Sequence, residues 1–599
     1  MLCNLQSPSS YMQAAFRAQN PCVVTRADGQ RMRKQTAYVF DFDPARTLII
    51  FDAFANNLSA DTADGRGTGD ARQANIRRLL NFFPVLGEDE AGRMVELDAA
   101  QVLSIPRRLK SAEVVRRGFL SNFLFANIGA VFGAPAVVCD IMDKLTPAQE
   151  DVRPKNPPRL DEVASVSVDE NGAAEVSGEI VIGRTQDIFG TKRYAEVEER
   201  IVTALPQIAA SADAAQVAES IAALTETVKE HLRTEVIAPV AAAYEVKPRA
   251  RERMERQAEQ EVERRLTEIH EDYAQQTNIA RAELARRRDA AETADEVTAA
   301  EAAFSAEMTA ALHSLTEAAQ AAAKEAIEEK PAELVERMER AKAEEKKRTL
   351  EDEVRARLRG FSRTIPSFVM AYGDAGLTLA NFDDYTEDDV FAEVTGITEA
   401  EFRFLRDGGT YTHPETGAEE YFAGHLFDEM VFNDSIAEFL KKREELADYF
   451  DEAHTEDIFD YIPPQRTNQI FTPRAVVRRM VDALEAENPG CFDDPTRTFA
   501  DLYMKSGLYI TEIVKRLYRS EKIKVEYPND ADRIRHILRN QVYGMAPTRI
   551  IYLIATNYIL GFDAAMKSET RNFVQADAAQ AAKDGRLAEL VEECFGGAS

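Results

Sequence analysis

The sequence predicts an α/β protein of several domains with a large helical insert. Three observations support this prediction. The chain has 599 residues, whereas a single domain usually has about 100 to 200. Apolar runs typical of strands occur near both ends, among patterns typical of helices. A long central stretch, in contrast, is dominated by alanine, glutamate, arginine and lysine, which favours long helices.

Composition excludes several classes of protein. No run of about 18 apolar residues is present, and the first residues lack the basic and then apolar order of a secretory signal. We therefore expect a cytoplasmic chain with no membrane partner. The five cysteines never fall at C-x-x-C spacing, which predicts reduced thiols and no metal site. A net charge of -30 argues against a DNA-binding surface spread over the whole molecule.

Residues 1–143 are expected to form a mixed α/β domain. After a helix-like opening, Ala37–Asp43 is predicted to be a strand, and Thr47–Phe51, beyond Pro44, a strand or a helix. Basic residues gather between these apolar stretches. They form either a local DNA-contact surface or an ordinary solvated surface: Arg26, Arg31, Arg33, Lys34, Arg46, Arg107, Arg108, Lys110, Arg116 and Arg117.

The middle of the chain is predicted to be a linker followed by a helical arm. Proline and charge are enriched in Leu145–Pro158, so residues 144–193 are assigned to a linker with short strands. In residues 194–359 apolar side chains recur every three or four positions, which predicts an exposed arm or an antiparallel coiled-coil hairpin. We expect Pro331 to interrupt this array and Leu350 to begin its continuation. The expected role is that of a spacer or lever.

Two further regions complete the predicted order. Residues 360–450 contain turn signals at Gly373–Gly376 and Asp407–Gly409 together with many aromatic residues, which indicates a compact helical module. Residues 451–599 return to alternation of strand and helix patterns.

The last region carries motifs in a definite order. Phe471-Thr472-Pro473 precedes a predicted helix, and about thirty residues later Asp501 ends a strand before Ser506-Gly507. Predicted second and third strands follow in Val542–Asn557 and Asn572–Asp577. This order resembles that of adenine-specific DNA methyltransferases. The resemblance implies part of a Rossmann-like fold that binds S-adenosylmethionine.

The resemblance also implies roles for individual residues. Phe471, Thr472 and Pro473 would pack on the cofactor, and Asp501, Ser506 and Gly507 would form the turn that meets its methionine part. Asp577 would accept a hydrogen bond from the adenine amine, although a helix cap is the alternative.

The sequence departs from the methyltransferase pattern at three points. Lys505 replaces the first glycine of the turn, where it either crowds the backbone or supplies a cation. Ala546 stands where the family places an acid for the ribose hydroxyls, which predicts weakened cofactor affinity. The catalytic [DNS]-P-P-[YFW] loop is absent from the sequence, so no catalytic residue is assigned.

The beginning of the chain resembles the last conserved motif of superfamily-two helicases. Gln13 and Arg17 are four positions apart and share one face of a helix, although chance would also produce this spacing. The resemblance, extended by Tyr38–Pro44, implies part of a RecA-like lobe in which both residues face ATP phosphates. Asn20 replaces the usual second arginine, and no G-x-x-x-x-G-K-[ST] loop occurs. We therefore expect ATP and Mg²⁺ only with a missing helicase lobe.

Together the two ends, with a coupler-like segment at Arg359–Tyr372, are similar to single-chain ATP-dependent restriction-modification enzymes of the type I, type III and type ISP kinds. We expect an internal fragment or split subunit that is inactive alone, with DNA and other restriction-modification subunits as partners. The alternative is a non-catalytic scaffold that couples separate motor and modification subunits.

Overall fold

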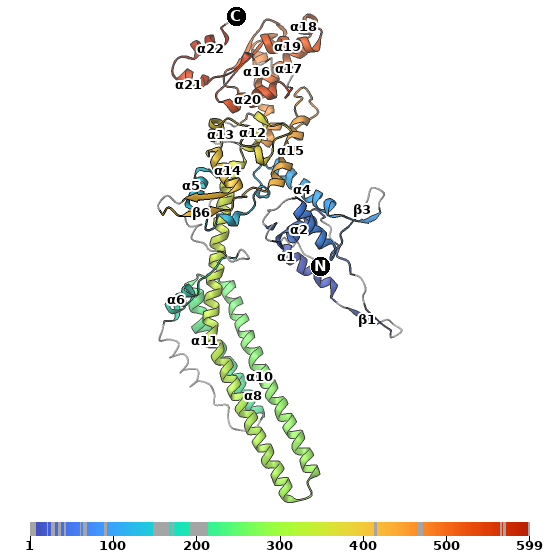
Figure 1. Cartoon of the computed structure of the whole chain (residues 1–599), viewed down its shortest axis with the longest axis vertical. Coiled ribbons are helices and arrows are strands. Elements are labelled where there is room, and N and C mark those ends of the chain that lie inside the picture. Colours follow the sequence, from blue (N-terminus) through green and yellow to red (C-terminus); the bar gives the residue numbers. More distant parts are fainter. Residues whose placement is uncertain are drawn as a thin grey trace. The chain divides into compact units, whose positions relative to one another are not determined.

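The computed structural model is mostly helical and divides into two compact units, Met1–Ser165 with Thr349–Ser599, and Val166–Arg348 (Figure 1). Among the residues that the structure describes, no helix is both long and apolar enough to cross a membrane. These residues are 8–20, 22–25, 30–33, 37–40, 44–59, 62–63, 69–88, 93–147, 168, 173–190, 214–412, 416–464, 471–563, 566, 569 and 571–596.

Four helices and two hairpins form an N-terminal module. Its side chains Met12, Ile76 and Val102 are completely buried in one hydrophobic core. The last helix begins at a capping box, in which Asp98 accepts from the Gln101 amide at 2.8 Å and the Gln101 side chain accepts from the Asp98 amide at 3.0 Å. The elements are α1 (Pro8–Phe16), β1 (Val23–Thr25), β2 (Arg31–Arg33), α2 (Pro44–Asn57), α3 (Gly69–Leu80), β3 (Leu86–Glu88), β4 (Met94–Glu96) and α4 (Ala99–Arg116).

The structure decides between the alternatives for Thr47–Phe51 in favour of a helix, and it shows no strand in the described part of Ala37–Asp43. Thr47–Phe51 lies inside α2, which begins at Pro44 because proline at a first helical position loses no hydrogen bond. Of the predicted strand Ala37–Asp43, residues 37–40 have no regular secondary structure, and 41–43 lie outside the described residues. The two described pairs of strands are antiparallel hairpins. The parallel sheet of a RecA-like lobe is therefore not seen in the part of 1–143 that the structure describes.

A coupler module follows the arm in sequence and is built around phenylalanine. Phe361, Phe382, Phe391 and Phe402 are fully buried, and the rings of Phe361 and Phe402 stack at 5.1 Å. The module is mostly helical, as predicted, with one hairpin that the sequence did not indicate. Its elements are α5 (Ala136–Lys144), α12 (Ile365–Tyr372), α13 (Asp388–Thr395), α14 (Glu399–Asp407), β5 (Gly409–Thr412), β6 (Glu419–Phe422) and α15 (Glu429–Glu445).

The chain after α4 contributes to this coupler. The Ala126 amide donates to the Leu426 carbonyl at 3.0 Å, and the Asp428 amide donates to the Leu124 carbonyl at 2.8 Å. A buried serine, Ser362, donates from its hydroxyl to the Phe119 carbonyl at 2.6 Å. The first and last thirds of the chain therefore share one body.

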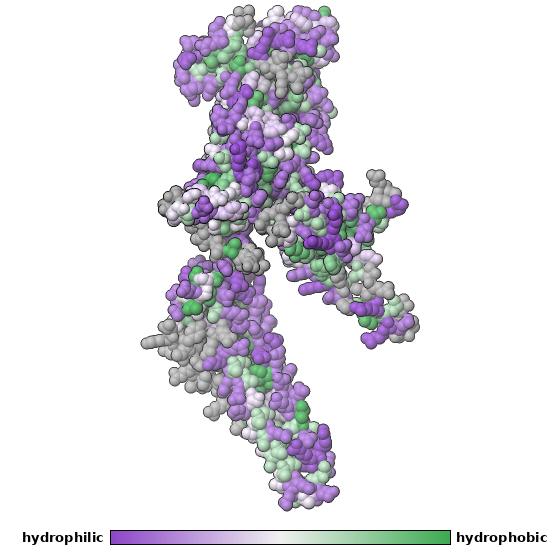
Figure 2. Space-filling view, viewed as in Figure 1, coloured by the Kyte–Doolittle hydropathy of each residue, from purple (hydrophilic) through white to green (hydrophobic). Residues whose placement is uncertain are grey.

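The second unit is a helical arm. In Figure 1, α10 and α11 run side by side as the two long limbs of a hairpin. Leu224 and Val228 of α8 belong to one buried cluster with Leu266 of α10 and Leu315 of α11. Purple hydrophilic residues cover much of the arm's visible surface in Figure 2. Its elements are α6 (Gly178–Phe189), α8 (Ala214–His231), the π-helical turn Leu232–Ile237, α9 (Ala238–Ala243), α10 (Pro248–Ala290) and α11 (Ala294–Ser362).

The long helical insert was predicted, but its expected interruption was not found. Helix α11 continues through Pro331, because a helix of this length has enough packed turns on either side to tolerate one missing amide donor. Most of the predicted linker 144–193 lies outside the described residues. Its described part holds an isolated bridge between Val168 and Ala174, and α6.

The C-terminal module contains a three-stranded parallel sheet. The strands run in the order β7 (Phe499–Asp501), β8 (Val542–Ala546), β9 (Phe573–Gln575), and each lies where the sequence predicted a strand. Helices connect the strands, as parallel pairing requires. Between β7 and β8 lie α17 (Leu508–Arg519), α18 (Glu521–Glu526) and α19 (Asp530–Asn540), and between β8 and β9 lies α20 (Arg549–Ile559). Helix α16 (Arg474–Glu487) precedes β7, and α21 (Ala578–Lys583) and α22 (Leu587–Phe595) follow β9.

Candidate functional site

The candidate site is the edge at which the three parallel strands end. Asp501 is paired with Gly544, and Ala546 with Gln575. The carboxyl ends of β7, β8 and β9 therefore lie side by side at one edge of the sheet. Ligands of open α/β sheets bind at the carboxyl ends of the strands, where loops lead into helices. The predicted residue Asp501 is the last residue of β7, and Ser506, Gly507 and Asp577 lie in the loops that lead from this edge into α17 and α21.

The turn from β7 to α17 is tied to the sheet by its own backbone. The Asp501 carboxylate accepts from the Tyr503 amide at 3.1 Å, and the Met504 amide donates to the Met545 carbonyl at 2.7 Å. Burial raises the pKa of Asp501, and no ion pair to this carboxylate is found among the described residues. A half-buried carboxylate without a charged partner retains the capacity to accept from a ligand.

Gly507 has a conformation that few other residues adopt. Its φ is +81°, and a Cβ at this position would stand 3.1 Å from the Ala555 carbonyl oxygen and 3.0 Å from Cγ1 of Ile559. Ser506 accepts from the Leu508 amide at 3.3 Å, within the turn that starts α17. The sequence therefore needs glycine here both for the backbone angle and for close packing of α17 on α20.

Lys505 lies in this turn, and its ammonium lies near the Tyr503 ring, 5.6 Å from the ring centre. The described residues offer this ammonium no ion pair. The side chain is half-buried. Both alternatives left by the sequence, crowding of the turn and a cation for the cofactor carboxylate, stay predictions.

The end of β8 lacks the expected acid. Ala546 is completely buried, and its carbonyl accepts from the Ala576 amide at 2.8 Å. Two residues further, the hydroxyl oxygen of Thr548 is buried without a hydrogen-bond partner in the described structure. Sequence reasoning missed Thr548. Its only signal was a threonine just before a helix, which ordinarily indicates a cap.

Asp577 is the N-cap of α21. Its Oδ1 accepts from the Gln580 amide at 2.9 Å, and the side chain is exposed. Asn572, just before β9, ties the start of this strand to the start of β8. Its buried amide donates to the Leu538 carbonyl at 3.0 Å and to the Val542 carbonyl at 3.2 Å. The structure therefore shows the capping role of Asp577. Contact with an adenine ring stays a prediction.

The Phe471-Thr472-Pro473 segment joins the module through aromatic contacts. The Phe471 ring lies 4.8 Å from Phe459, which in turn lies 4.9 Å from Tyr558 of α20. Pro473 caps α16, one position before the predicted first turn. Residues 468–470, the start of the motif, lie outside the described residues. The sequence had not indicated Phe459 and Tyr558 as partners of this segment.

The helicase-like pair lies in the N-terminal module. Gln13 is on the exposed side of α1, while Met12 and Ala15 are buried on the other side. Helix α1 ends at Phe16, and Arg17 begins a 3-10 turn that closes before Asn20. Both side chains of the pair are exposed. No contact with a phosphate-binding loop is shown, because the sequence contains no such loop.

Several of the basic residues considered for DNA contact are neutralised by acids. Lys110 pairs with Asp52 at 3.0 Å, and Arg107 with Asp434 at 2.7 Å. Arg116 pairs with Glu113 at 2.5 Å. These pairs favour structural and solvated roles for the three cations. In the part of the chain that the structure describes, no cluster of histidine, cysteine and acidic residues fits a metal ion.

No family model, no curated protein and no solved structure matches this chain. Its chemistry is therefore inferred from its own residues and geometry.

Proposed function

We propose that the C-terminal module binds S-adenosylmethionine, and that the chain serves an ATP-dependent DNA restriction-modification system in which a helicase is joined to an adenine-specific methyltransferase. One observation carries this proposal. The motif residues Asp501, Ser506 and Gly507 lie at the carboxyl end of the first of three consecutive parallel strands, in the order that such a cofactor site requires.

The residues at the turn suit the methionine part of the cofactor. Backbone amides at the start of α17 and the Lys505 ammonium would attract its carboxylate, and Asp501 would accept from its ammonium. When bound, the cofactor supplies an electrophilic methyl group. The fit is poorer at the ribose, because Ala546 offers no acceptor. The buried Thr548 hydroxyl is the polar group closest along the chain to that position.

Complete reactions need groups that this sequence lacks. Holding a flipped adenine requires a polar residue and an aromatic ring at the catalytic loop, and the [DNS]-P-P-[YFW] sequence is absent. ATP hydrolysis requires a phosphate-binding loop, which is also absent. We therefore propose a cofactor-binding fragment or split subunit that works with DNA and further restriction-modification subunits.

Calorimetric titration with S-adenosylmethionine tests this proposal. We expect saturable binding at one site, weakened about ten- to a hundredfold in Asp501→Ala, because a charged hydrogen-bond acceptor is lost. Asp584→Ala is the matched control, since Asp584 is an exposed acid in the same module away from the strand ends, and it should leave affinity unchanged. Equal binding by wild type and Asp501→Ala would contradict the proposed site.

A non-catalytic scaffold is the second candidate. Two observations favour it: Ala546 fills the place of the ribose acceptor, and one carboxylate oxygen of Asp577 is engaged in capping. A scaffold predicts no heat of binding and no shift in melting temperature with the cofactor. It also predicts a stable complex with separate motor and modification subunits.

A further inference from the structure

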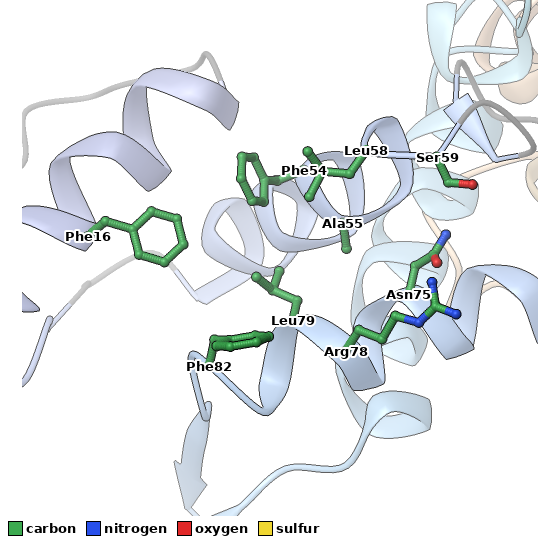
Figure 3. A pocket seen from close by; sticks show the side chains of 9 residues that line it. All are labelled: Phe16, Phe54, Ala55, Leu58, Ser59, Asn75, Arg78, Leu79 and Phe82. Carbon is green, nitrogen blue, oxygen red and sulfur yellow. The ribbon is translucent and has the colours of Figure 1, made fainter.

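A hydrophobic groove lies in the N-terminal module, far along the chain from the strand ends. Helices α1, α2 and α3 enclose a cavity of about 410 Å³. Its walls come from all three helices, as Figure 3 shows. The lining residues are Phe16, Phe54, Ala55, Leu58, Ser59, Asn75, Arg78, Leu79 and Phe82.

The two ends of the groove differ in chemistry. In Figure 3, Phe16, Phe54 and Phe82 stand at one end, whereas Asn75 and Arg78 lie together at the other. The Phe16 and Phe54 rings are 6.3 Å apart and tilted by 58°, and Phe16 also packs edge-on against Phe83 at 5.2 Å. Both Phe16 and Phe54 are only partly buried, so part of each ring is exposed to an apolar group. A ligand that fits both ends must combine an apolar body with a polar or anionic head.

The groove is open to solvent along its rim. Leu58 is 71% exposed and Phe82 is 72% exposed, whereas Ala55 and Leu79 form a buried floor. Sites for small molecules usually enclose most of the ligand. An open groove with large exposed apolar side chains on both sides suits one face of a protein segment instead.

The polar end carries an uncompensated positive charge. Arg78 is exposed, and the structure shows no hydrogen bond or ion pair for it among the described residues. The nearest buried acid along the adjoining helix, Asp52, is already paired with Arg72 and Lys110. Asn75 is held in place, because its amide donates to the Thr62 hydroxyl at 2.8 Å. The guanidinium is therefore available to a carboxylate from outside.

We propose that this groove docks a peptide segment of a partner protein that carries an aromatic or large aliphatic side chain followed closely by an aspartate or glutamate. The apolar side chain occupies the end lined by Phe16, Phe54 and Phe82. The carboxylate pairs with Arg78. On a helical segment the two residues would be three or four positions apart, because that spacing places them on one face.

Selection from a random twelve-residue peptide library on the full chain tests the proposal. We expect enriched peptides to share an apolar anchor and an acid at a fixed spacing. One enriched peptide and its glutamine-for-acid variant are then titrated by fluorescence anisotropy. Removing the acid should weaken binding about three- to tenfold, as expected for a partly exposed charge-assisted hydrogen bond.

Variants of the chain locate the binding. Phe82→Ala should abolish measurable binding of the enriched peptide, and circular dichroism checks that this exposed position leaves the fold intact. Arg78→Gln should weaken only the acid-containing peptide, to the level of its glutamine variant. Arg77→Gln is the matched control, because Arg77 is an exposed neighbour on α3 that does not line the groove, and it should change neither affinity.

Three outcomes would overturn the proposal. The library gives no peptide that distinguishes wild type from Phe82→Ala. The enriched peptides bind Arg78→Gln and Arg77→Gln equally. Free N-acetylphenylalanine binds as tightly as the enriched peptides, in which case the groove is a small-molecule site. None of these readouts involves S-adenosylmethionine, so they are independent of the cofactor proposal.

Discussion

Four charged side chains from four helices meet in the interior at Asp52. Its carboxylate contacts Lys110 at 3.0 Å and Arg72 at 3.2 Å, and Arg72 reaches Asp428 at 3.4 Å. Burial alone raises the pKa of Asp52, but Lys110 and Arg72 outweigh it and hold the pKa below its ordinary value. Because Asp428 also caps α15, this cluster joins the N-terminal module to the coupler.

Asp52→Asn should destabilise this junction by about 3–5 kcal/mol, because Lys110 would lose its acid and Arg72 would keep only the longer pair with Asp428. The measurement is hydrogen exchange of amides in α2, α3 and α4 of the full chain, which should become faster. Asp434→Asn removes the acid from the exposed pair with Arg107, and it should cost less than about 1 kcal/mol. Equal protection in both variants would contradict a special role for Asp52.

The same carboxylate gives a dependence on pH. The pKa of Asp52 is lower in the folded chain than in the unfolded chain. The contribution of Asp52 to folding stability is therefore fully present above its unfolded pKa, and it is lost as the pH falls through the folded pKa. Protection of α2, α3 and α4 should therefore decline as pH is lowered below about 4. In Asp52→Asn this decline should be smaller, since one titrating group has been removed.

At the residue scale, sequence reasoning found single positions but not their partners. Arg72 and Asp428 are 356 positions apart, and no local pattern indicates such a pair. Asp501 and Gly507 were predicted because their roles are local: one ends a strand, and the other permits a left-handed turn. Thr548 was missed because an orphaned hydroxyl is visible only after packing is known.

At the level of single elements, the start of α17 depends on a glycine with a positive φ that is packed against α20. Gly507→Ala should destabilise the C-terminal module by about 2–4 kcal/mol, since it adds both a strained φ and contacts with α20. Gly585→Ala has a similar φ of +71° but open space around it, and should cost only about 1–2 kcal/mol. The stabilities of the two variants are compared by chemical denaturation, with hydrogen exchange of the amides in β7 and β8 as the readout.

Some elements follow from sequence more directly than others. The arm was predictable because apolar residues recur every three or four positions through α10 and α11. Strand β8 was predictable because all its residues are apolar or small, and the structure buries them all. Thr47–Phe51 is also apolar, but it lies in α2, since a short apolar run does not distinguish a buried strand from a buried helix.

For the whole molecule, charge limits what the chain can do with DNA alone. The net charge is -30, and three of the cations considered for DNA contact, Arg107, Lys110 and Arg116, are already paired with acids. We expect the isolated chain to bind a non-specific duplex more weakly than about 10 µM at physiological salt. Fluorescence anisotropy at two salt concentrations measures this. Tight binding with a steep salt dependence would instead indicate a concentrated basic surface.

One of the two compact units is built from two separate segments of the chain, Met1–Ser165 and Thr349–Ser599, which the ribosome makes at different times. Hydrogen bonds such as that from Ala126 to Leu426 connect chain segments that are separated by the inserted unit Val166–Arg348. A ribosome adds about 5–20 residues per second, so the roughly 180 inserted residues delay the second segment by about 10 to 40 s. Throughout that interval the first segment of this unit, Met1–Ser165, exposes surfaces that the second segment, Thr349–Ser599, will cover, and chaperones have their longest opportunity to bind it.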